Sequence, residues 1–222
     1  MLARHGRALL RKIGTATGLF REDRRRLWRD LLVRIDRYVI YGADVNEVAP
    51  PPQSEAMTFR RLSDEEVRHL PSESEAFRAE QRERFERFGF NDAYAVFCDG
   101  ELSHVSWLIT PRHEAASGGR IVRLREGEAE ITACFTLAKF RGRGVYGYAI
   151  RSLCQVARSR GIHRVFMKTT LQNYASQHGI SKAGLLCRGQ IIRISFPLFP
   201  RVGAAYREHR LPWNTAPGTQ AR

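Results

Sequence analysis

The feature that most restricts the fold of this chain is a glycine-rich loop between an expected strand and an expected helix. The loop reads Arg141-Gly142-Arg143-Gly144-Val145-Tyr146-Gly147. The apolar stretch 131–137 before it is typical of a buried strand, and 145–161 after it has apolar residues at helical spacing. Glycines allow backbone N–H groups to converge, and a helix N-terminus adds partial positive charge. The sequence therefore predicts a phosphate site within an α/β fold.

The segments around this loop alternate between strand and helix, which predicts one mixed sheet. Two local signals support the pattern: Ser63 and Glu66 form a capping box at a helix start, and Asp99-Gly100 is typical of a hairpin. We expect strands at 57–62, 93–98, 102–109, 121–124, 131–137, 165–169, 185–190 and 191–196. We expect helices at 63–71, 73–90, 145–161 and 173–183. The predicted fold class is α/β (α+β), a single domain over 57–196 with a mixed sheet flanked by helices.

Both ends of the chain lie outside this predicted domain. Residues 1–56 are expected to form a basic helical extension that ends in a proline-rich linker at 49–52. The helical spacing in this extension rests on Trp28, Leu31, Leu32, Ile35, Tyr38 and Val39. The arm could dock on its own domain or on a second copy in a homodimer, lie on an anionic membrane, or serve as a transit peptide. Residues 197–222 are expected to be an irregular tail.

The chain has 222 residues and a formal net charge of +14, which is unevenly distributed. Residues 1–40 contribute +7 and 41–130 contribute −7, whereas 131–207 contain thirteen basic side chains and no Asp or Glu. Such a block predicts a positive surface for a polyanionic ligand. The sequence has no apolar run long enough to span a membrane and no signal-peptide block, which favours a cytoplasmic protein.

The cysteines offer no metal or redox motif. Cys98, Cys134, Cys154 and Cys187 are too far apart in sequence for a C-x-x-C site. We expect them to be reduced thiols, mostly buried, and we predict no metal site.

Two known phosphate motifs fit the loop poorly. Gly142, Gly144 and Gly147 spell the dinucleotide pattern G-x-G-x-x-G, but this pattern needs an acidic residue about 20 positions later, and the next acid is Glu208. An NADP variant with arginine in that place stays open. A Walker loop needs Lys and then Ser or Thr directly after Gly144, where the sequence has Val-Tyr.

A third pattern fits better, and with it the chain resembles the GCN5-related N-acetyltransferase (GNAT) superfamily. In that family a strand ends in Arg/Gln-x-x-Gly-x-Gly/Ala before a helix, and here Arg141 and Gly144 match while Tyr146 replaces the last small residue. Downstream, the family's spacing is matched by Asn173, Ser176, Lys182 and Gly184. The resemblance is strong over 129–189 and extends over 57–196.

The resemblance implies acetyl-CoA as the acyl donor, with its pyrophosphate on the loop and no metal. The positions that it assigns to CoA are Cys134, Phe135, Thr136, Arg141, Gly142, Arg143, Gly144, Val145, Tyr146, Asn173 and Ser176. The basic side chains expected near the CoA phosphates are Lys139, Arg141, Arg143, Arg151, Lys168 and Lys182.

The resemblance also implies a general base, Glu130, which stands eleven residues before Arg141 as in the histone-acetyltransferase branch. A simpler interpretation makes Glu130 a surface carboxylate at a strand end. Glu128 is the first rival, because alternation places it on the same face if the strand begins there; Glu126 and Glu101 match no family position.

The general acid stays unassigned. Many relatives place a tyrosine seven residues after the Asn, where this chain has Ile180. Possible substitutes, each of which could equally be a packing or surface residue, are Tyr146, Tyr148, Tyr174, Ser176 and His178.

These features favour an acyl-CoA-dependent N-acyltransferase that moves acetyl from acetyl-CoA to the primary amine of a small molecule by direct transfer. The alternative is a non-catalytic protein of the same fold that binds nucleic acid or an anionic membrane surface, although a single Arg-Gly-Arg-Gly copy is weak support for RNA binding. The helices and loops at 63–119, which would shape an acceptor pocket, carry no motif that identifies the amine.

Overall fold

The structure of this protein is a computed structural model, and it describes residues 32–70, 92–112, 123–196 and 204–211. The helix expected at 73–90 and most of the N-terminal extension lie outside the described residues, as does the first half of the strand expected at 121–124.

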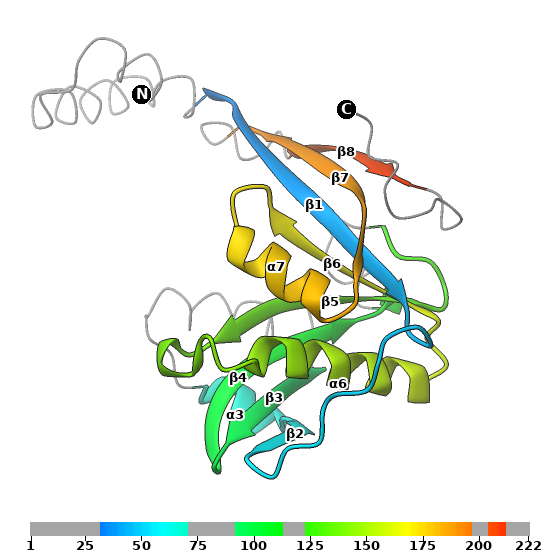
Figure 1. Cartoon of the computed structure of the whole chain (residues 1–222). Helices are drawn as coiled ribbons and strands as arrows, with labels where there is room; N and C mark the ends of the chain where they lie inside the picture. Colours follow the sequence, from blue (N-terminus) through cyan, green and yellow to red (C-terminus); the bar gives the residue numbers. More distant parts are fainter. Residues whose placement is uncertain (1–31, 71–91, 113–122, 197–203, 212–222) are drawn as a thin grey trace, which may run out of the picture. The chain divides into compact units, whose positions relative to one another are not determined.

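Eight strands form one mixed sheet in the order β2-β3-β4-β5-β6-β1-β7-β8 (Figure 1). The strands are β1 Arg34–Asp44, β2 Met57–Arg61, β3 Ala93–Cys98, β4 Glu101–Ile109, β5 Glu128–Thr136, β6 Arg164–Thr170, β7 Leu186–Ser195 and β8 Ala204–Arg210. Pairing is antiparallel from β2 through β5 and between β6 and β1, whereas β5 and β6 are parallel. The predicted fold class, one mixed sheet with flanking helices, is confirmed.

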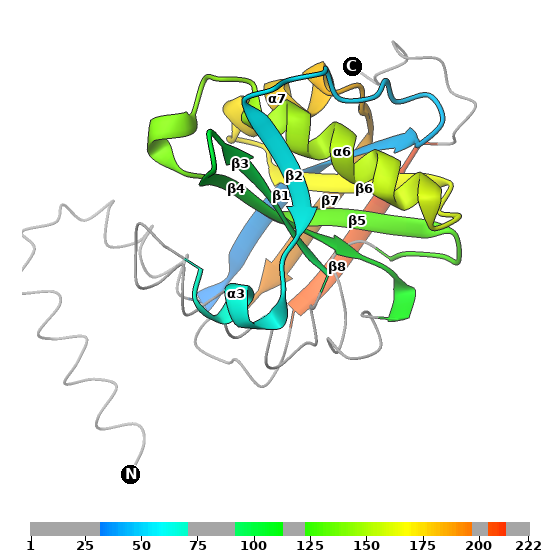
Figure 2. The same cartoon turned by 90° about the horizontal axis from the view of Figure 1, so that it is seen from below.

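The helices lie on both faces of this sheet (Figure 2). They are α3 Asp64–Arg68, the short 3-10 turn η1 Ala138–Phe140, α6 Val145–Ser159 and α7 Tyr174–Lys182. α6 and α7 cover one face, where Ile150 and Leu153 of α6 pack on Leu108 and Ile131 of the sheet. α3 lies on the opposite face, where its Val67 joins a second core cluster.

The local signals of the sequence formed as expected. Ser63 accepts a hydrogen bond from the Glu66 N–H at 3.2 Å, and the Glu66 carboxylate accepts from the Ser63 N–H at 2.8 Å, so the capping box opens α3. Asp99 and Gly100 both have positive φ at the tip of the β3–β4 hairpin. The two strands expected at 185–190 and 191–196 are one strand, β7.

The helical prediction for the end of the N-terminal extension is wrong. Ile35, Tyr38 and Val39 belong to β1, which pairs with β6 from Tyr38↔Thr170 to Asp44↔Arg164. Ile35 is exposed and Tyr38 half-buried in this strand, and only Val39 enters its buried stretch, residues 39–43. A few apolar residues at the end of a segment cannot be assigned to a helix or a strand by their spacing alone.

The prediction of an irregular tail is also wrong in part, because β8 adds a strand beside β7. The sequence of β8 is mostly polar, so its conformation depends on pairing with β7 rather than on its own pattern. The Leu211 N–H continues this pairing with a 2.7 Å hydrogen bond to the Arg188 carbonyl.

The chain divides into two units by its internal packing. The larger unit, Arg37–Ile191 with Glu208–Arg222, contains every element of the site described below. The smaller unit is Met1–Asp36 with Ile192–Arg207, and its described residues are the ends of β1, β7 and β8. Within it, Asp36 pairs with Arg34 at 2.9 Å and with Arg193 at 3.4 Å.

The cysteines form no disulfide, and the described helices do not span a membrane. All four cysteines are free thiols, and Cys98 and Cys154 are fully buried. Over the described ranges, every helix is too short or too polar to cross a bilayer.

Candidate active site

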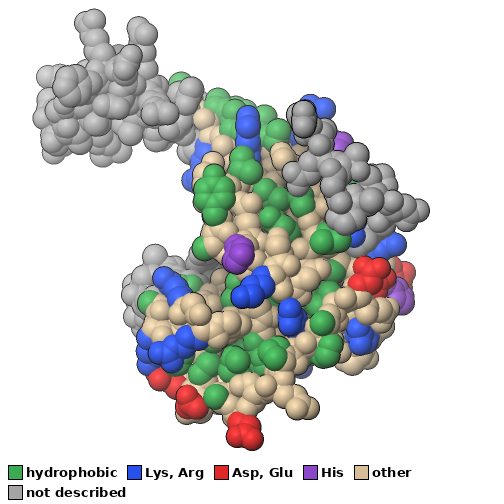
Figure 3. Space-filling model, in the orientation of Figure 1, with side chains coloured by type: hydrophobic (Ala, Val, Ile, Leu, Met, Phe, Trp, Pro, Cys, Tyr) green, Lys and Arg blue, Asp and Glu red, His purple; other side chains and the backbone are tan. Residues whose placement is uncertain are grey.

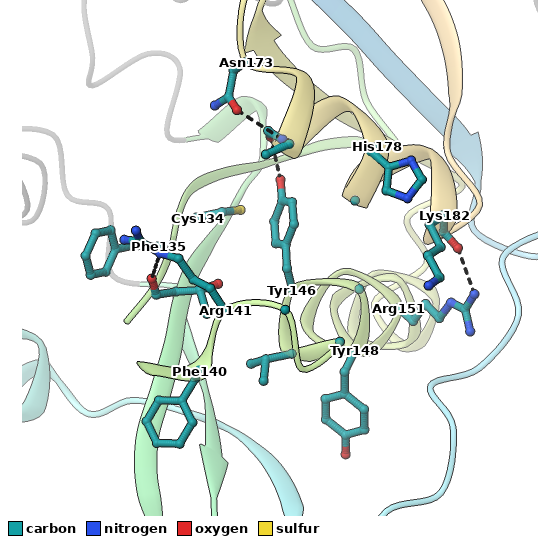
Figure 4. Close-up of a pocket in the computed structure, with 18 of the residues that line it drawn as sticks. Cys134, Phe135, Phe140, Arg141, Tyr146, Tyr148, Arg151, Asn173, His178 and Lys182 are labelled. Atoms are coloured by element: carbon teal, nitrogen blue, oxygen red, sulfur yellow. Dashed lines mark hydrogen bonds between the residues drawn. The ribbon is translucent and has the colours of Figure 1, made fainter. Parts of the chain in front are cut away.

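A cavity of about 770 Å³ opens between the end of β5, the start of α6 and the length of α7 (Figure 4). Ten of the eleven positions assigned to CoA line it: Cys134, Phe135, Thr136, Arg141, Gly142, Gly144, Val145, Tyr146, Asn173 and Ser176. Arg143, the eleventh, does not line it, and its guanidinium lies over the Phe140 ring at 5.6 Å. Four further residues line the cavity although sequence analysis gave them no role at the site: Pro52, Phe140, Ala175 and Gly179.

The glycine loop closes one end of the cavity. Gly144 is the N-cap of α6 with φ of +80°, a left-handed conformation that residues with a Cβ rarely adopt. The first turn of α6 begins directly after it, so the N–H groups of that turn have no partner within the helix. These N–H groups and the helix dipole make the loop a site for an anion.

Among the described residues, the charged side chains of the cavity wall are all positive. Arg141, Arg151 and Lys182 line it, and none of the described lining residues is Asp or Glu. The Arg141 Nε donates to the Thr136 carbonyl at 3.1 Å, which holds this arginine against the end of β5. Figure 3 shows Lys and Arg side chains over α6, α7 and the loop before α6, with Asp and Glu along the lower edge and at the right of this face.

Some of the basic residues that were expected near the CoA phosphates do not line the cavity. Lys139 is ion-paired with Glu101 at the surface, and Lys168 is paired with Glu130 on the other face of the sheet. Arg151 lines the cavity but also donates to the Lys182 carbonyl at 3.0 Å, which caps the end of α7.

The strands beside the cavity separate. β5 and β6 are paired only from Glu128↔Arg164 to Glu130↔Phe166, although both strands continue beyond this point. β5 also carries a bulge against β4, where Ala133 has φ of +53°. A bulge leaves backbone groups outside the ladder. This unpaired stretch beyond Glu130 and Phe166, the β5–β6 gap, begins next to the cavity wall formed by Cys134, Phe135 and Thr136.

Tyr146 crosses the cavity from α6 to α7. Its hydroxyl is 3.1 Å from the Ser176 Oγ, and the Ser176 N–H is in turn capped by the Asn173 side chain at 3.1 Å (Figure 4). Its ring packs so closely on Gly179 that an added Cβ there would stand 2.6 Å from Cδ1. Burial raises the pKa of the Cys134 thiol beside it to about 12, so this thiol is neutral.

His104 of β4 does not line the cavity but contacts two residues that do, Thr136 and Tyr146, and sequence analysis missed it. Its Nδ1 is 2.7 Å from the Thr136 Oγ1, and its ring lies 5.7 Å from that of Tyr146. Burial lowers the pKa of His104 to about 3, so the imidazole is neutral. No sequence motif marks it, because it reaches Thr136 only through pairing of β4 with β5.

Glu130 does not line the cavity but lies on the opposite face of the sheet. In register it stands between Ile109 of β4 and Phe166 of β6, which belong to core clusters away from α6. Its side chain is 2% exposed and forms an ion pair with Lys168, whose side chain is 17% exposed. The expectation of a simple surface carboxylate is therefore wrong.

Two of the rival carboxylates, Glu128 and Glu101, are engaged elsewhere. β5 begins at Glu128, so Glu128 and Glu130 share a face as alternation predicts. Glu128 accepts from the Arg125 N–H at 3.0 Å and lies 3.6 Å from Arg210, so it holds the base of β5. Glu101 pairs with Lys139.

Comparison with known proteins decides the family. Residues 48–186 match the model of the acetyltransferase (GNAT) domain, which is more than half of the chain. This chain belongs to the GNAT acetyltransferase family. No curated protein matches its sequence.

Solved structures share the GNAT fold at low sequence identity. An acetyltransferase of the GNAT family from Colwellia psychrerythraea is 13% identical with a TM-score of 0.54, over 78% of this chain and 60% of that one. A conserved protein of unknown function from Staphylococcus epidermidis is 12% identical with a TM-score of 0.52, over 78% and 66%. A glucosamine N-acetyltransferase region of a fungal multi-domain β-N-acetylglucosaminidase is 13% identical with a TM-score of 0.56, over 76% and 22%. This chain thus spans less than two thirds of each.

GNAT domains use acetyl-CoA as the acyl donor, and the residues of the cavity suit that ligand. CoA is a polyanion with a thiol arm. The cavity offers an anion loop at one end and a largely apolar wall on which the charged side chains of the described residues, Arg141, Arg151 and Lys182, are all positive. The described residues contain no cluster of three or more His, Cys, Asp or Glu side chains that could hold a metal ion.

Proposed function

We propose that this GNAT chain transfers an acyl group, acetyl in the simplest case, from acyl-CoA to the primary amine of a small molecule, with Glu130 as the general base. The observation that carries the proposal is the cavity: a glycine loop at the start of α6 meets a wall whose described residues include no acid, and the cavity continues along the end of β5.

The donor would bind on the α6 side. Its pyrophosphate would lie on Gly142–Gly144 and the N–H groups of the first turn of α6, with Arg141 and Lys182 adding charge. Its thiol arm would run along Cys134 and Thr136 toward the gap between the strands. Backbone N–H groups near the Ala133 bulge are suited to stabilise the oxyanion that develops on the carbonyl.

The acceptor would approach from the other face of the sheet, where Glu130 and Lys168 lie. The nitrogen lone pair attacks the thioester carbonyl carbon, the amine proton passes to Glu130 directly or through one water, and the C–S bond then breaks with its electron pair on sulfur. The Lys168 ammonium offsets the cost of burying the Glu130 carboxylate before the proton arrives.

Donor binding is tested with two glycine variants. Gly144 and Gly161 have φ of +80° and +71°, and at both an added Cβ would meet no atom within 4 Å. Alanine therefore strains both backbones similarly, by about 1–2 kcal/mol, but only Gly144 belongs to the loop. We expect Gly144→Ala to weaken acetyl-CoA binding by about tenfold or more, measured by calorimetry, while Gly161→Ala leaves the affinity unchanged. Equal affinities in the two variants, or no binding to the natural chain, contradict the proposal.

The base is tested with two glutamate variants of the same strand. Glu130→Gln should keep acetyl-CoA affinity and lose about 100-fold or more in kcat at neutral pH, in a thiol-release assay over a panel of primary amines. Glu128→Gln is the matched control, because Glu128 is equally buried, ion-paired and on the same face. Full turnover in Glu130→Gln would exclude Glu130 as the base, and a loss confined to Glu128→Gln would move the role to Glu128.

A further inference from the structure

Acyl transfer from a thioester places negative charge on a sulfur, and this charge is formed inside the cavity if the proposed function is correct. Thiols have a pKa of about 8.5 in water, and withdrawal from water makes the thiolate less favourable unless a donor faces it. A hydroxyl or N–H group on the cavity wall near the end of β5 would stabilise such a thiolate by donating a hydrogen bond to the sulfur.

Most of the side chains that sequence analysis considered as the general acid are placed where they cannot donate to a sulfur in the cavity. Ile180 is fully buried in the core and has no donor. The Tyr148 hydroxyl donates to the Met57 carbonyl at 3.2 Å. Tyr174 is 74% exposed and does not line the cavity. His178 lies on the other side of Tyr146 from Cys134 (Figure 4).

Tyr146 and Ser176 remain, and they are bonded to each other. The Tyr146 hydroxyl lies between the Ser176 Oγ on α7 and the Cys134 thiol on β5, where α6, α7 and β5 meet. The Tyr146 side chain starts from the first turn of α6 and its hydroxyl lies next to the Cys134 thiol, so it spans the cavity from the anion loop to the β5 wall. An arm that runs from that loop along β5 would pass this hydroxyl.

Packing fixes the ring in this position. Gly179 leaves no room for the ring to move toward α7, because even a methyl group there would stand 2.6 Å from Cδ1. His104 lies 5.7 Å away on the sheet side. A hydroxyl held in advance stabilises a developing charge without reorganisation.

We propose that the Tyr146 hydroxyl, held by Ser176, donates a hydrogen bond to the CoA sulfur and stabilises the thiolate as it leaves. Tyr146 thereby becomes a catalytic residue of the transfer, supplied by α6 rather than by the tyrosine position on α7 that Ile180 occupies.

The hydroxyl acts as a donor and not as a proton source. As the C–S bond breaks, its electron pair moves to sulfur, the Tyr146 O–H shortens its contact to that sulfur, and the proton that completes CoA-SH comes from solvent. Burial raises the pKa of Tyr146 above its ordinary value, so the hydroxyl keeps its proton throughout the pH range in which CoA titrates. The Ser176 hydroxyl can rotate to donate to the Tyr146 oxygen while that oxygen's own proton faces the sulfur.

The test compares CoA with desulfo-CoA, which lacks only the sulfur, by calorimetry on the full chain. With the natural chain, the ratio of the two affinities should rise about fivefold or more from about pH 7 to about pH 9.5, as the bound thiol ionises more readily than the free one. Tyr146→Phe should abolish this rise, since the ring still packs on Gly179 but carries no donor. Tyr148→Phe, in the same turn of α6, should keep it.

The outcomes separate this proposal from the function on which it rests. A rise that persists in Tyr146→Phe, or that is absent from the natural chain although both ligands bind, overturns the role of Tyr146 and leaves the proposed function intact. If the natural chain binds neither ligand, both proposals fail. Once an acceptor is known, Tyr146→Phe should lower kcat about tenfold to a hundredfold with little change in KM for acetyl-CoA.

Discussion

Replacing Lys168 with methionine would leave the Glu130 carboxylate buried without its partner. The Glu130 side chain is 2% exposed, so water cannot replace the ammonium, whereas Lys168 is 17% exposed and keeps some solvation. Removing one member of a buried pair costs about 3–5 kcal/mol in free energy of unfolding, because an uncompensated charge remains. The partial exposure of Lys168 places the expected loss at the lower end, about 3 kcal/mol.

A double-mutant cycle isolates this pair. Glu130→Gln with Lys168→Met removes both charges and should restore stability to within about 1 kcal/mol of the natural chain. The assay is urea denaturation at neutral pH, followed by circular dichroism, for the four proteins of the cycle.

Two results would refute this reasoning. A loss below about 1 kcal/mol in Lys168→Met would mean that the pair behaves like an exposed one. A double variant that is no more stable than Lys168→Met would mean that the lysine stem, and not its charge, stabilises β6.

Three further changes test other parts of the fold. Gly179→Ala should cost about 1–3 kcal/mol in thermal denaturation and weaken CoA binding, because its methyl group displaces the Tyr146 ring; an unchanged melting temperature would contradict the close packing. The pKa of His104 is lowered to about 3 from 6.5, so in acid the unfolded chain takes up a proton at this residue before the folded chain does. The free energy of unfolding should therefore fall by up to about 1.4 kcal/mol per pH unit as the pH drops from about 6.5 toward 3. His104→Gln should remove that slope from a urea titration series, and an identical slope in the variant would assign it to other groups. Ser63→Ala should cost about 1 kcal/mol by removing the cap of α3, measured by urea denaturation, and no loss would mean that the cap is not stabilising.

Much of the site was predictable because its parts are close together in sequence. The glycines of the loop from Arg141 to Gly147 predict a turn and the start of a helix. Asn173 and Ser176 predict the start of the next helix. Ten of the eleven residues inferred to contact CoA line one cavity because they belong to three such local units, β5, α6 and α7. Their roles toward the ligand remain predictions.

The failures fall where a residue's environment is set by a distant part of the chain. The end of the N-terminal extension, predicted to be helical, belongs to the β1 strand, because its conformation depends on pairing with β6, which lies more than a hundred residues away. Arg143, although in the motif, turns toward Phe140 instead of the cavity. His104 carries no sequence signal at all, because only its pairing across to Thr136 gives it a place in the site.

The sequence by itself determined the order of the described strands and helices from β2 to β7, the anion loop and the acid-free block around it, since these depend on backbone preference and residue type over short distances. The tertiary structure alone decided that Glu130 is buried against Lys168, that Tyr146 reaches Ser176, and that the chain's first described strand lies between β6 and β7. Each of these depends on which residues, distant in sequence, come into contact when the strands and helices pack together. The spacing of residues along the chain does not predict those contacts.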